Sequence, residues 1–210
     1  MKGPLFITFE GIDGSGKSTQ ARRLAEVLRG AGAPVTLTRE PGGSAGAEEI
    51  RALLVTGDPG RWSAETEILL FTAARRDHLE RTIHPALTRG DVVICDRFAD
   101  STRIYQGATR GDLRGKVDRL HELMIGVEPD LTLIIDMDPG HALRRGLARE
   151  GAGQRFEDMG LALQEKVRAG YLDLARAAPS RCIVVDGDRD ADSIAHDIAA
   201  IVRDRLDRGQ

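Results

Sequence analysis

A short glycine-rich loop stands at residues 11–18, where the sequence is Gly-Ile-Asp-Gly-Ser-Gly-Lys-Ser. An apolar run precedes this loop, and apolar residues at helical spacing follow it. A strand, such a loop and a helix in that order form the context of the phosphate-binding pattern Gly-x-x-x-x-Gly-Lys-Ser/Thr. Glycines let successive backbone N–H groups turn toward phosphate oxygens, and the start of the helix adds its positive dipole end. The loop therefore predicts a strand–loop–helix unit that holds the phosphates of a nucleotide.

The residues of this loop have distinct expected roles. Lys17 supplies a mobile positive charge to the β- and γ-phosphates. The hydroxyl of Ser18 is the expected Mg²⁺ ligand, because Mg²⁺ prefers hard oxygens and takes most of its coordination from phosphate and water. The implied cofactors are ATP and Mg²⁺. We expect the nucleotide to be contacted by Gly11, Ile12, Asp13, Gly14, Ser15, Gly16, Lys17, Ser18 and Thr19.

Strand and helix patterns alternate along the chain, which is typical of an α/β fold. Five apolar runs predict buried strands at residues 4–10, 35–38, 91–96, 131–136 and 181–186. The helical stretches carry apolar stripes, each expected to cover one face of the sheet, such as Val117, Leu120, Met124 and Val127. Right-handed crossovers place the C-terminal ends of the strands along one edge, where ligands bind. The length of 210 residues predicts a single domain, residues 1–210.

Composition argues against several kinds of partner. A net charge of -3 with 30% charged residues describes a mixed-charge surface, so we expect no nucleic-acid partner. The N-terminal apolar stretch is too short for a signal peptide, and no later run is long enough to span a membrane. Cys95 and Cys182 stand in strand-like runs, which favours buried thiols over a disulfide. These features predict a cytoplasmic protein.

Residues at the strand ends separate the classes of phosphate-loop protein. The sequence contains no asparagine, which excludes the Asn-Lys-x-Asp motif of GTPases and the Asn-dependent catalytic loop of protein kinases. Asp96 and Asp136 each end a strand and are candidates for the carboxylate near Mg²⁺. They continue as Arg97 and Met137 rather than as a water-activating Glu, which disfavours a dedicated ATPase. The alternative role for Asp96 is that of a helix N-cap.

Two arginines at strand ends suit a second ligand that carries phosphate. Arg39 leads from the second strand into Glu-Pro-Gly-Gly, a tight loop that can hold a guanidinium at the sheet edge. Arg97 directly follows the third strand. Two guanidinium groups on one dianion would position an acceptor phosphate. The alternative is a surface role, since 26 of the 30 basic residues are Arg.

Phe71 and Arg75 are four residues apart in a helical stretch and therefore share one face. There the ring can stack on a planar base while the guanidinium donates to the edge of that base. The alternative is that Phe71, which ends the run Ile-Leu-Leu-Phe, belongs to the core.

Residues 144–157 are interpreted as a lid between two helices. Four arginines surround a Glu-Gly-Ala-Gly tip: Arg144, Arg145, Arg149 and Arg155. Closure of such a segment brings positive charge to the transferring phosphoryl group and excludes water. The alternative is an exposed basic cluster at a helix end.

Taken together, these motifs resemble those of thymidylate kinases over about residues 4–186. Six motifs occur in the same order as in that family: Glu-Gly-Ile-Asp-Gly at 10–14, Arg-Glu-Pro-Gly-Gly at 39–43, Glu-Ile-Leu-Leu-Phe at 67–71, Asp-Arg-Phe at 96–98, Tyr-Gln-Gly at 105–107 and Pro-Asp-Leu-Thr at 129–132. The resemblance implies an α/β P-loop NTPase fold with a five-stranded parallel sheet in the order 2-3-1-4-5, flanked by helices on both faces. It also implies transfer of the γ-phosphoryl group of ATP to dTMP, and a homodimer.

The resemblance further implies a role for each site residue. The dTMP phosphate would be held by Arg39 and Arg97; the base by Phe71, Arg75 (at O4), Thr102 and Gln106; and the deoxyribose by Tyr105 and Asp13, with Tyr105 leaving no room for a 2′-hydroxyl. The metal would be held by Glu10, Ser18 and Asp96, and the catalytic set would be Lys17, Asp96, Arg97, Arg149 and Arg155, with Arg144 on the nucleotide. Family members with lid arginines have a small residue at the position of Ser15. Gln154 departs from the family's usual Asp.

Two other functions stay open at this point. One is a different small-molecule kinase, such as a deoxynucleoside kinase, although the pair Arg39 and Arg97 favours an acceptor that already carries phosphate. The other is a nucleotide-dependent switch module without transfer activity, for which the sequence offers no recognisable partner surface.

Overall fold

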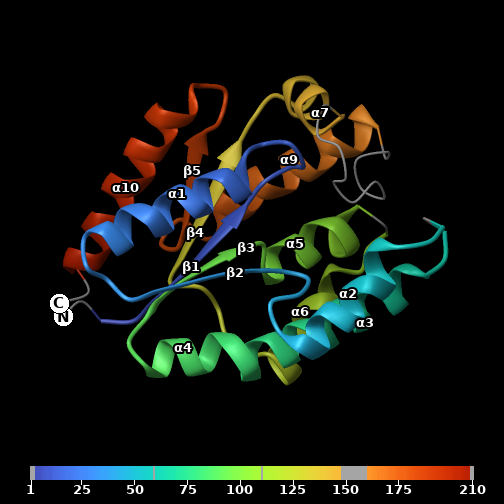
Figure 1. The fold of residues 1–210 in the computed structure, drawn as a ribbon. Helices are drawn as coiled ribbons and strands as arrows, with labels where there is room; N and C mark the ends of the chain where they lie inside the picture. Colours follow the sequence, from blue (N-terminus) through green and yellow to red (C-terminus); the bar gives the residue numbers. More distant parts are fainter. Residues whose placement is uncertain (1–2, 59, 110, 148–159, 209–210) are drawn as a thin grey trace.

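The computed structural model describes residues 3–58, 60–109, 111–147 and 160–208. Strands and helices alternate along the chain (Figure 1). The elements are β1 (Leu5–Glu10), α1 (Lys17–Gly30), β2 (Val35–Arg39), α2 (Ala45–Val55), α3 (Ala64–His78), the π-helical η1 (Leu79–Ile83), α4 (His84–Thr88), β3 (Val92–Asp96), α5 (Ala99–Thr102), the π-helical η2 (Arg103–Ala108), α6 (Arg114–Met124), β4 (Leu131–Asp136), α7 (Pro139–Leu147), α9 (Leu161–Ala177), β5 (Cys182–Asp186) and α10 (Ala191–Arg208).

The five strands form one parallel sheet in the order β2-β3-β1-β4-β5. In the register of the central strand, Ile7 pairs with Ile94 on one side and with Leu131 on the other. The predicted sheet and its order are confirmed, and each predicted strand agrees with the structure to within one residue at either end. Because all strands run in one direction, their C-terminal ends and the loops that follow lie along one edge.

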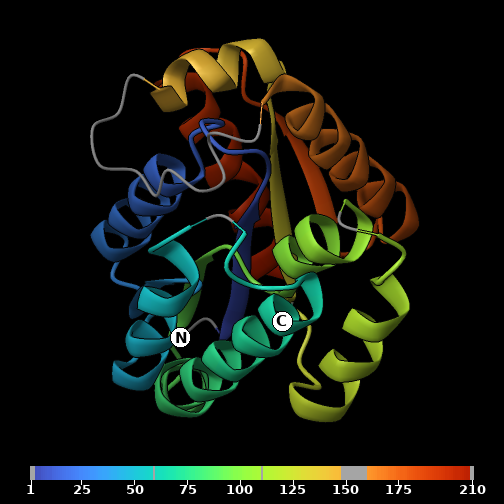
Figure 2. The same ribbon diagram turned by 90° about the vertical axis from the view of Figure 1, so that its right-hand side faces the viewer.

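Helices cover both faces of the sheet (Figure 2). Strand side chains alternate in direction, so Leu5, Ile7 and Phe9 of β1 face one layer while Phe6 faces the other. The first layer consists of α1 and α10, whose apolar side chains pack against the strands. On the opposite face lie η1, α4, η2 and α9. This three-layer arrangement holds the loops at the sheet edge in place.

The expectation that the middle helix covers the sheet is wrong. Val117 is buried, but α6 packs against η2 and α3 rather than against strands. Helix α6 ends at Met124, which is 47% exposed, next to Leu123 at 76%. The spacing of apolar residues identified a helix correctly but could not show which surface the helix packs against.

Both cysteines have buried thiols without a disulfide, as the sequence predicts. Within the described residues, no helix has the length and apolar character needed to cross a membrane.

Candidate active site

The glycine-rich loop follows β1 and leads directly into α1. Positive φ angles at Gly11, Gly14 and Gly16 curl its backbone into a cradle. At Gly14 a Cβ atom would lie 2.0 Å from the carbonyl oxygen of Ala142, and at Gly11 it would lie 2.5 Å from that of Ile135. Glycine is therefore required at both positions by local crowding as well as by φ. The N-terminus of α1 points its free N–H groups into this cradle, which makes it an anion site.

Lys17 lies at the start of α1 with only 6% of its surface exposed. Its Nζ donates to the carbonyl oxygen of Ile12 at 2.7 Å, a bond that folds the side chain back over the loop. Burial, reinforced by the charge of Arg97, lowers the pKa of Lys17 to about 8. A lysine in this state gains strongly from an anionic ligand, because the ligand supplies the charge partner that burial removed.

Ser18 and Asp96 meet at the C-terminal ends of β1 and β3. The Ser18 hydroxyl donates to Asp96 Oδ2, while Asp96 Oδ1 is buried and has no hydrogen-bond partner among the described residues. A hydroxyl and a carboxylate oxygen are hard ligands of the kind that Mg²⁺ prefers. The described residues contain no group of three His, Cys, Asp or Glu side chains that could hold a metal ion by themselves. The Ser18–Asp96 pair therefore fits an ion that takes its other ligands from phosphate and water.

The other candidate carboxylate, Asp136, is occupied. Arg168 of α9 binds it through two parallel hydrogen bonds, Nε to Oδ1 at 2.6 Å and Nη2 to Oδ2 at 2.8 Å. Asp136 thus anchors α9 to the end of β4. Of the two strand-end aspartates, Asp96 is the one left available for a cation.

The geometry gives no support to Glu10 as a metal ligand. Its carboxylate is fully buried, and it accepts hydrogen bonds from the backbone N–H groups of Phe98 and Ser101, from the Ser101 hydroxyl and from the Tyr171 hydroxyl, at 2.6 to 3.2 Å. Burial, together with the charge of Asp100, raises the pKa of Glu10. In this structure Glu10 ties the loop after β3 to α9.

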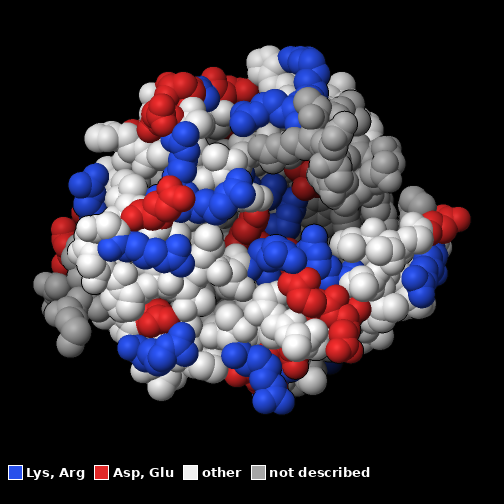
Figure 3. Space-filling model, viewed as in Figure 1, with Lys and Arg blue, Asp and Glu red and all other residues white. Residues whose placement is uncertain are grey.

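A cleft of roughly 340 Å³ opens beside the loop, and Figure 3 shows basic side chains, with acidic ones among them, in and beside this hollow. The cleft brings together most of the predicted residues from separate strands, helices and loops. Those that line it are Asp13, Gly14, Gly16, Lys17, Ser18, Arg39, Phe71, Arg75, Asp96, Arg97, Thr102, Tyr105 and Gln106. Gly11, Ile12 and Ser15 belong to the body of the loop and Thr19 to the first turn of α1, and none of the four lines the cleft. The cleft thus joins the phosphate cradle to a second ligand site.

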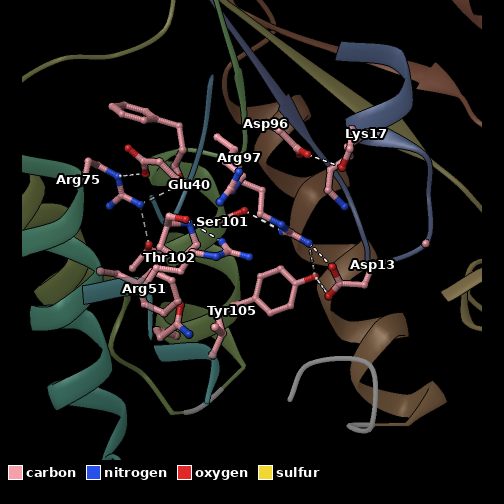
Figure 4. A pocket seen from close by; sticks show the side chains of 18 of the residues that line it. Asp13, Lys17, Glu40, Arg51, Arg75, Asp96, Arg97, Ser101, Thr102 and Tyr105 are labelled. Carbon is pink, nitrogen blue, oxygen red and sulfur yellow. Dashed lines mark hydrogen bonds and ion pairs between the residues drawn. The ribbon is translucent and has the colours of Figure 1, made fainter. Parts of the chain in front are cut away.

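Arg97 stands at the centre of the cleft with a left-handed backbone, φ 72°. Its guanidinium contacts Asp13 and donates to the Ser101 hydroxyl at 2.9 Å, while Tyr105 donates to Asp13 at 3.0 Å (Figure 4). Burial alone would lower the pKa of Arg97, but Asp13 raises it well above its usual value. The same contact helps to lower the pKa of Asp13 against the opposing effect of burial. Two groups predicted to bind the acceptor, Arg97 and Asp13, thus contact each other.

Arg39 lies at the mouth of the cleft, where Nη2 donates to both carboxylate oxygens of Glu48 at 3.0 and 3.1 Å. A third arginine, Arg51 of α2, lines the same cleft as Arg39 and Arg97, and it was not predicted from the sequence. It donates to the carbonyl oxygen of Pro41 at 2.7 Å, and burial, together with the charge of Arg39, lowers its pKa. Lowering of an arginine pKa by burial and like charge marks a site that suits an anion. No local pattern distinguishes Arg51 from the other arginines of the sequence.

Phe71 and Arg75 share one face of α3, and both line the cleft, as their spacing predicts. Phe71 is half-buried at the wall rather than part of the core clusters. Arg75 is 3% exposed and donates to Thr102 Oγ1 at 3.0 Å. Gln106 donates to Glu67 at 3.3 Å, so its amide group is oriented at the back of the cleft. Other lining residues that the sequence analysis missed are Glu40, Pro41, Val55, Phe98 and Ser101.

Only the beginning of the predicted lid lies within the described residues. Arg144 is exposed on α7 and lines a second pocket with Met137, His141, Arg145, Gly187, Asp188 and Arg189. Arg145 lies beside the phosphate loop, since a Cβ atom at Gly16 would stand 3.7 Å from its Nη2. Arg149, Gln154 and Arg155 fall outside the described residues.

A phosphate cradle that opens into a cleft lined by arginines defines a P-loop kinase that acts on a small molecule. The family model for thymidylate kinase matches residues 9–198, and the chain belongs to that family. It is 69% identical to the thymidylate kinase of Ruegeria pomeroyi over 97% of both chains, and 54% identical to that of Caulobacter vibrioides over 96% of this chain and 97% of the relative. A crystal structure of thymidylate kinase from Ehrlichia chaffeensis matches with a TM-score of 0.77 at 37% identity, over 95% of this chain and 99% of that one. The predicted family and the predicted P-loop NTPase fold are thereby confirmed.

Proposed function

We propose that the cleft transfers the γ-phosphoryl group of ATP to the phosphate of dTMP, giving ADP and dTDP. The observation that carries this proposal is that one cleft is lined both by Lys17 of the phosphate loop and by the guanidinium groups of Arg39, Arg51 and Arg97. A reaction between two phosphorylated ligands requires two groups of phosphate-binding residues that face the same cleft.

On the donor side, the loop backbone and Lys17 hold the β- and γ-phosphates and stabilise the charge that develops as the phosphoryl group leaves. Mg²⁺, when held by Ser18 and Asp96 together with phosphate oxygens, neutralises phosphate charge. Arg144, Arg149 and Arg155 are proposed to close over the nucleotide, where they add positive charge and exclude water.

On the acceptor side, Arg39, Arg51 and Arg97 are proposed to bind and orient the dTMP phosphate as the nucleophile. Asp13 accepts from the 3′-hydroxyl, a role supported by its carboxylate facing the cleft beside Tyr105. Tyr105 closes the space beside C2′ and so favours deoxyribose. Phe71 stacks on thymine, Arg75 donates to its O4, and Thr102 and Gln106 line the rest of the base pocket.

An acceptor panel tests the function. ADP release, measured by coupled assay with every nucleoside monophosphate and with thymidine, is expected to be fastest with dTMP. Faster release with thymidine would instead identify a deoxynucleoside kinase. Thymidine carries no phosphate, so that result would also show that Arg39, Arg51 and Arg97 do not serve to bind an acceptor phosphate. The absence of turnover with any acceptor would favour the switch module.

Substitution of the proposed base-contacting residues should affect the acceptor alone. Phe71→Ala and Arg75→Ala are each expected to raise KM for dTMP by about tenfold or more, since each removes roughly 1.5 kcal/mol of stacking or charge-assisted hydrogen bonding. KM for ATP should hold. Arg81→Ala is the matched control, because Arg81 is 74% exposed and lies outside the cleft. Equal rises in both KM values would show that Phe71 and Arg75 only support the fold.

The pKa of Lys17 predicts a pH dependence of nucleotide affinity. A bound phosphate favours the charged ammonium, so the pKa of Lys17 rises on binding from its free value of about 8. The contribution of the Lys17 charge to the free energy of nucleotide binding is fully present at pH values below the pKa of the free enzyme, and it is lost as the pH rises through the pKa of the nucleotide complex. Calorimetry in buffers of different ionisation heat should detect little proton uptake by Lys17 at about pH 7 and clear uptake at about pH 9. Equal uptake in Lys17→Met would assign the protons to another group.

A homodimer and a cytoplasmic location are also proposed. The exposed side chains of Leu69 on α3 and of Leu123 and Met124 on α6 support the dimer. The two helices are held together by Lys116–Glu65 at one end and by Arg76 with the Met124 carbonyl at the other, so the apolar residues lie on a shared surface. Light scattering should give twice the chain mass, and Leu69→Asp should shift the protein toward the monomer. An unshifted dimer in that variant would place the interface elsewhere.

The proposed cytoplasmic location is supported by the two buried thiols, Cys95 and Cys182, which form no disulfide.

A further inference from the structure

The guanidinium of Arg75 is fixed by three residues, one in the loop after β2 and two at the ends of α5. Nε donates to Glu40 at 2.7 Å and Nη2 donates to Thr102 Oγ1 at 3.0 Å (Figure 4). Nη2 also donates to the Phe98 carbonyl at 3.2 Å. The Phe98 ring lies beneath the group, with Cζ 5.2 Å from the ring centre. Among the described residues, Nη1 makes no hydrogen bond. One N–H edge of a rigidly held guanidinium is therefore available to a ligand in the cleft.

Glu40 is in turn held from behind by a histidine that does not line the cleft. Its side chain is 3% exposed, and its Oε1 lies 3.1 Å from Nδ1 of His78, which is fully buried at the end of α3. A carboxylate that already accepts from a guanidinium offers only acceptor oxygens, so Nδ1 of His78 carries the proton between them. His78 Nε2 lies 2.7 Å from the hydroxyl of Thr38 on β2.

The surrounding backbone leaves space for this chain of contacts. A Cβ atom at Gly43 would stand 2.4 Å from both His78 Nε2 and Thr38 Oγ1, so only glycine permits the contact between them. The N–H of Glu40 donates to the Asp96 carbonyl at 2.9 Å, which ties the carboxylate's own backbone to the end of β3. Thr38, His78, Glu40 and Arg75 thus form one buried chain from the sheet edge to the cleft.

We propose that His78 is a positioning residue for acceptor recognition: through Glu40 it fixes the orientation of the Arg75 guanidinium and so selects a base with an acceptor at that point, as O4 of thymine is. The proposal rests on the proposed base contact of Arg75. An exocyclic amine at the same point, as in cytosine, would place a donor against the free N–H edge. His78 therefore contributes to the choice between these bases without touching either.

The chain offers variants that separate the two contacts of His78. In His78→Asn the amide nitrogen takes the place of Nδ1 and keeps the bond to Glu40. In His78→Gln the amide reaches the place of Nε2 and keeps only the contact with Thr38, and His78→Leu keeps neither. Ile83→Val, a buried change one turn further along, is the control for a general loss of packing. Steady-state kinetics with dTMP, dCMP and ATP, together with thermal unfolding, would be measured for each variant.

The expected result is a rise in KM for dTMP of about tenfold in His78→Leu and His78→Gln, with kcat and KM for ATP held and the preference for dTMP over dCMP reduced. His78→Asn should retain KM for dTMP within about twofold. In the background of Arg75→Ala, the His78→Leu change should add nothing. A His78→Asn variant as impaired as His78→Leu, or parallel changes in both KM values, would overturn the proposal.

The same variants distinguish a failure of the proposed base contact of Arg75 from a failure of the positioning role of His78. If Arg75→Ala leaves KM for dTMP unchanged, the base-contacting role of Arg75 is wrong and the role of His78 falls with it. If Arg75→Ala raises KM for dTMP while His78→Leu does not, the base contact stands and only the positioning role of His78 is overturned.

Discussion

Lys17→Ala is expected to lower kcat by about 10²–10³-fold while the protein remains folded. The ammonium is buried at the head of the phosphate loop, where its charge acts on the transferring phosphoryl group in a largely water-excluded site. Its loss removes stabilisation that is strongest in the transition state, so kcat should fall more than ATP affinity. The coupled ADP-release assay at saturating ATP and dTMP measures this, and circular dichroism checks the fold.

Lys116→Ala is the control for that variant, because Lys116 is 64% exposed in a surface ion pair with Glu65 and exposed pairs contribute little. It should leave kcat unchanged. A folded Lys17→Ala variant that turns over at the normal rate would refute the proposed donor site.

Arg97→Ala and Arg97→Gly are expected to lower kcat/KM for dTMP by about 10²–10³-fold, since both remove a desolvated charge at the centre of the cleft. Their stabilities should differ. Arg97 has φ 72°, a conformation that costs an L-residue about 1 kcal/mol or more and glycine almost nothing. Denaturant unfolding should therefore find Arg97→Gly more stable than Arg97→Ala by about 1 kcal/mol.

If Arg97→Ala and Arg97→Gly lose the same activity but differ in stability, the guanidinium acts on the substrate, and the left-handed backbone conformation affects only the stability of the fold. Arg22→Ala is the matched control, since Arg22 is exposed on α1 away from the cleft. If Arg97→Ala kept the normal KM for dTMP, the acceptor phosphate would have to bind elsewhere.

The sequence predicted the fold well because its strongest signals are local. Strand runs, the glycine-rich loop and helical stripes each depend on residues close in the chain, and the elements match the predicted ones closely. Arg39 and Arg97 could be placed near one cleft because parallel strands bring their C-terminal ends to one edge. Asp96, which keeps one carboxylate oxygen unpaired among the described residues, and Asp136, which is held by an arginine, could not be told apart from the sequence. The partner of Asp136 is Arg168, which is 32 positions away on another element.

Other parts of the site depended on packing that the sequence does not display. Glu10 has the residue type of a metal ligand, but its burial beneath Phe98 and Tyr171 is a property of three elements together. Arg51 reaches the cleft only because α2 lies against the loop that follows β2. The exposure of Met124 likewise follows from where α6 is placed.

The close approach of Gly14 to α7 has a mechanical consequence. The loop backbone and the carbonyl of Ala142 stand so near that even a methyl group would not fit between them. Any displacement of the loop toward α7 therefore has to displace α7 as well. Arg144 and Arg145 stand on that helix within one turn of the contact. A movement of the phosphate cradle toward α7 would therefore move these arginines through the main chain, whether or not their side chains touch the nucleotide.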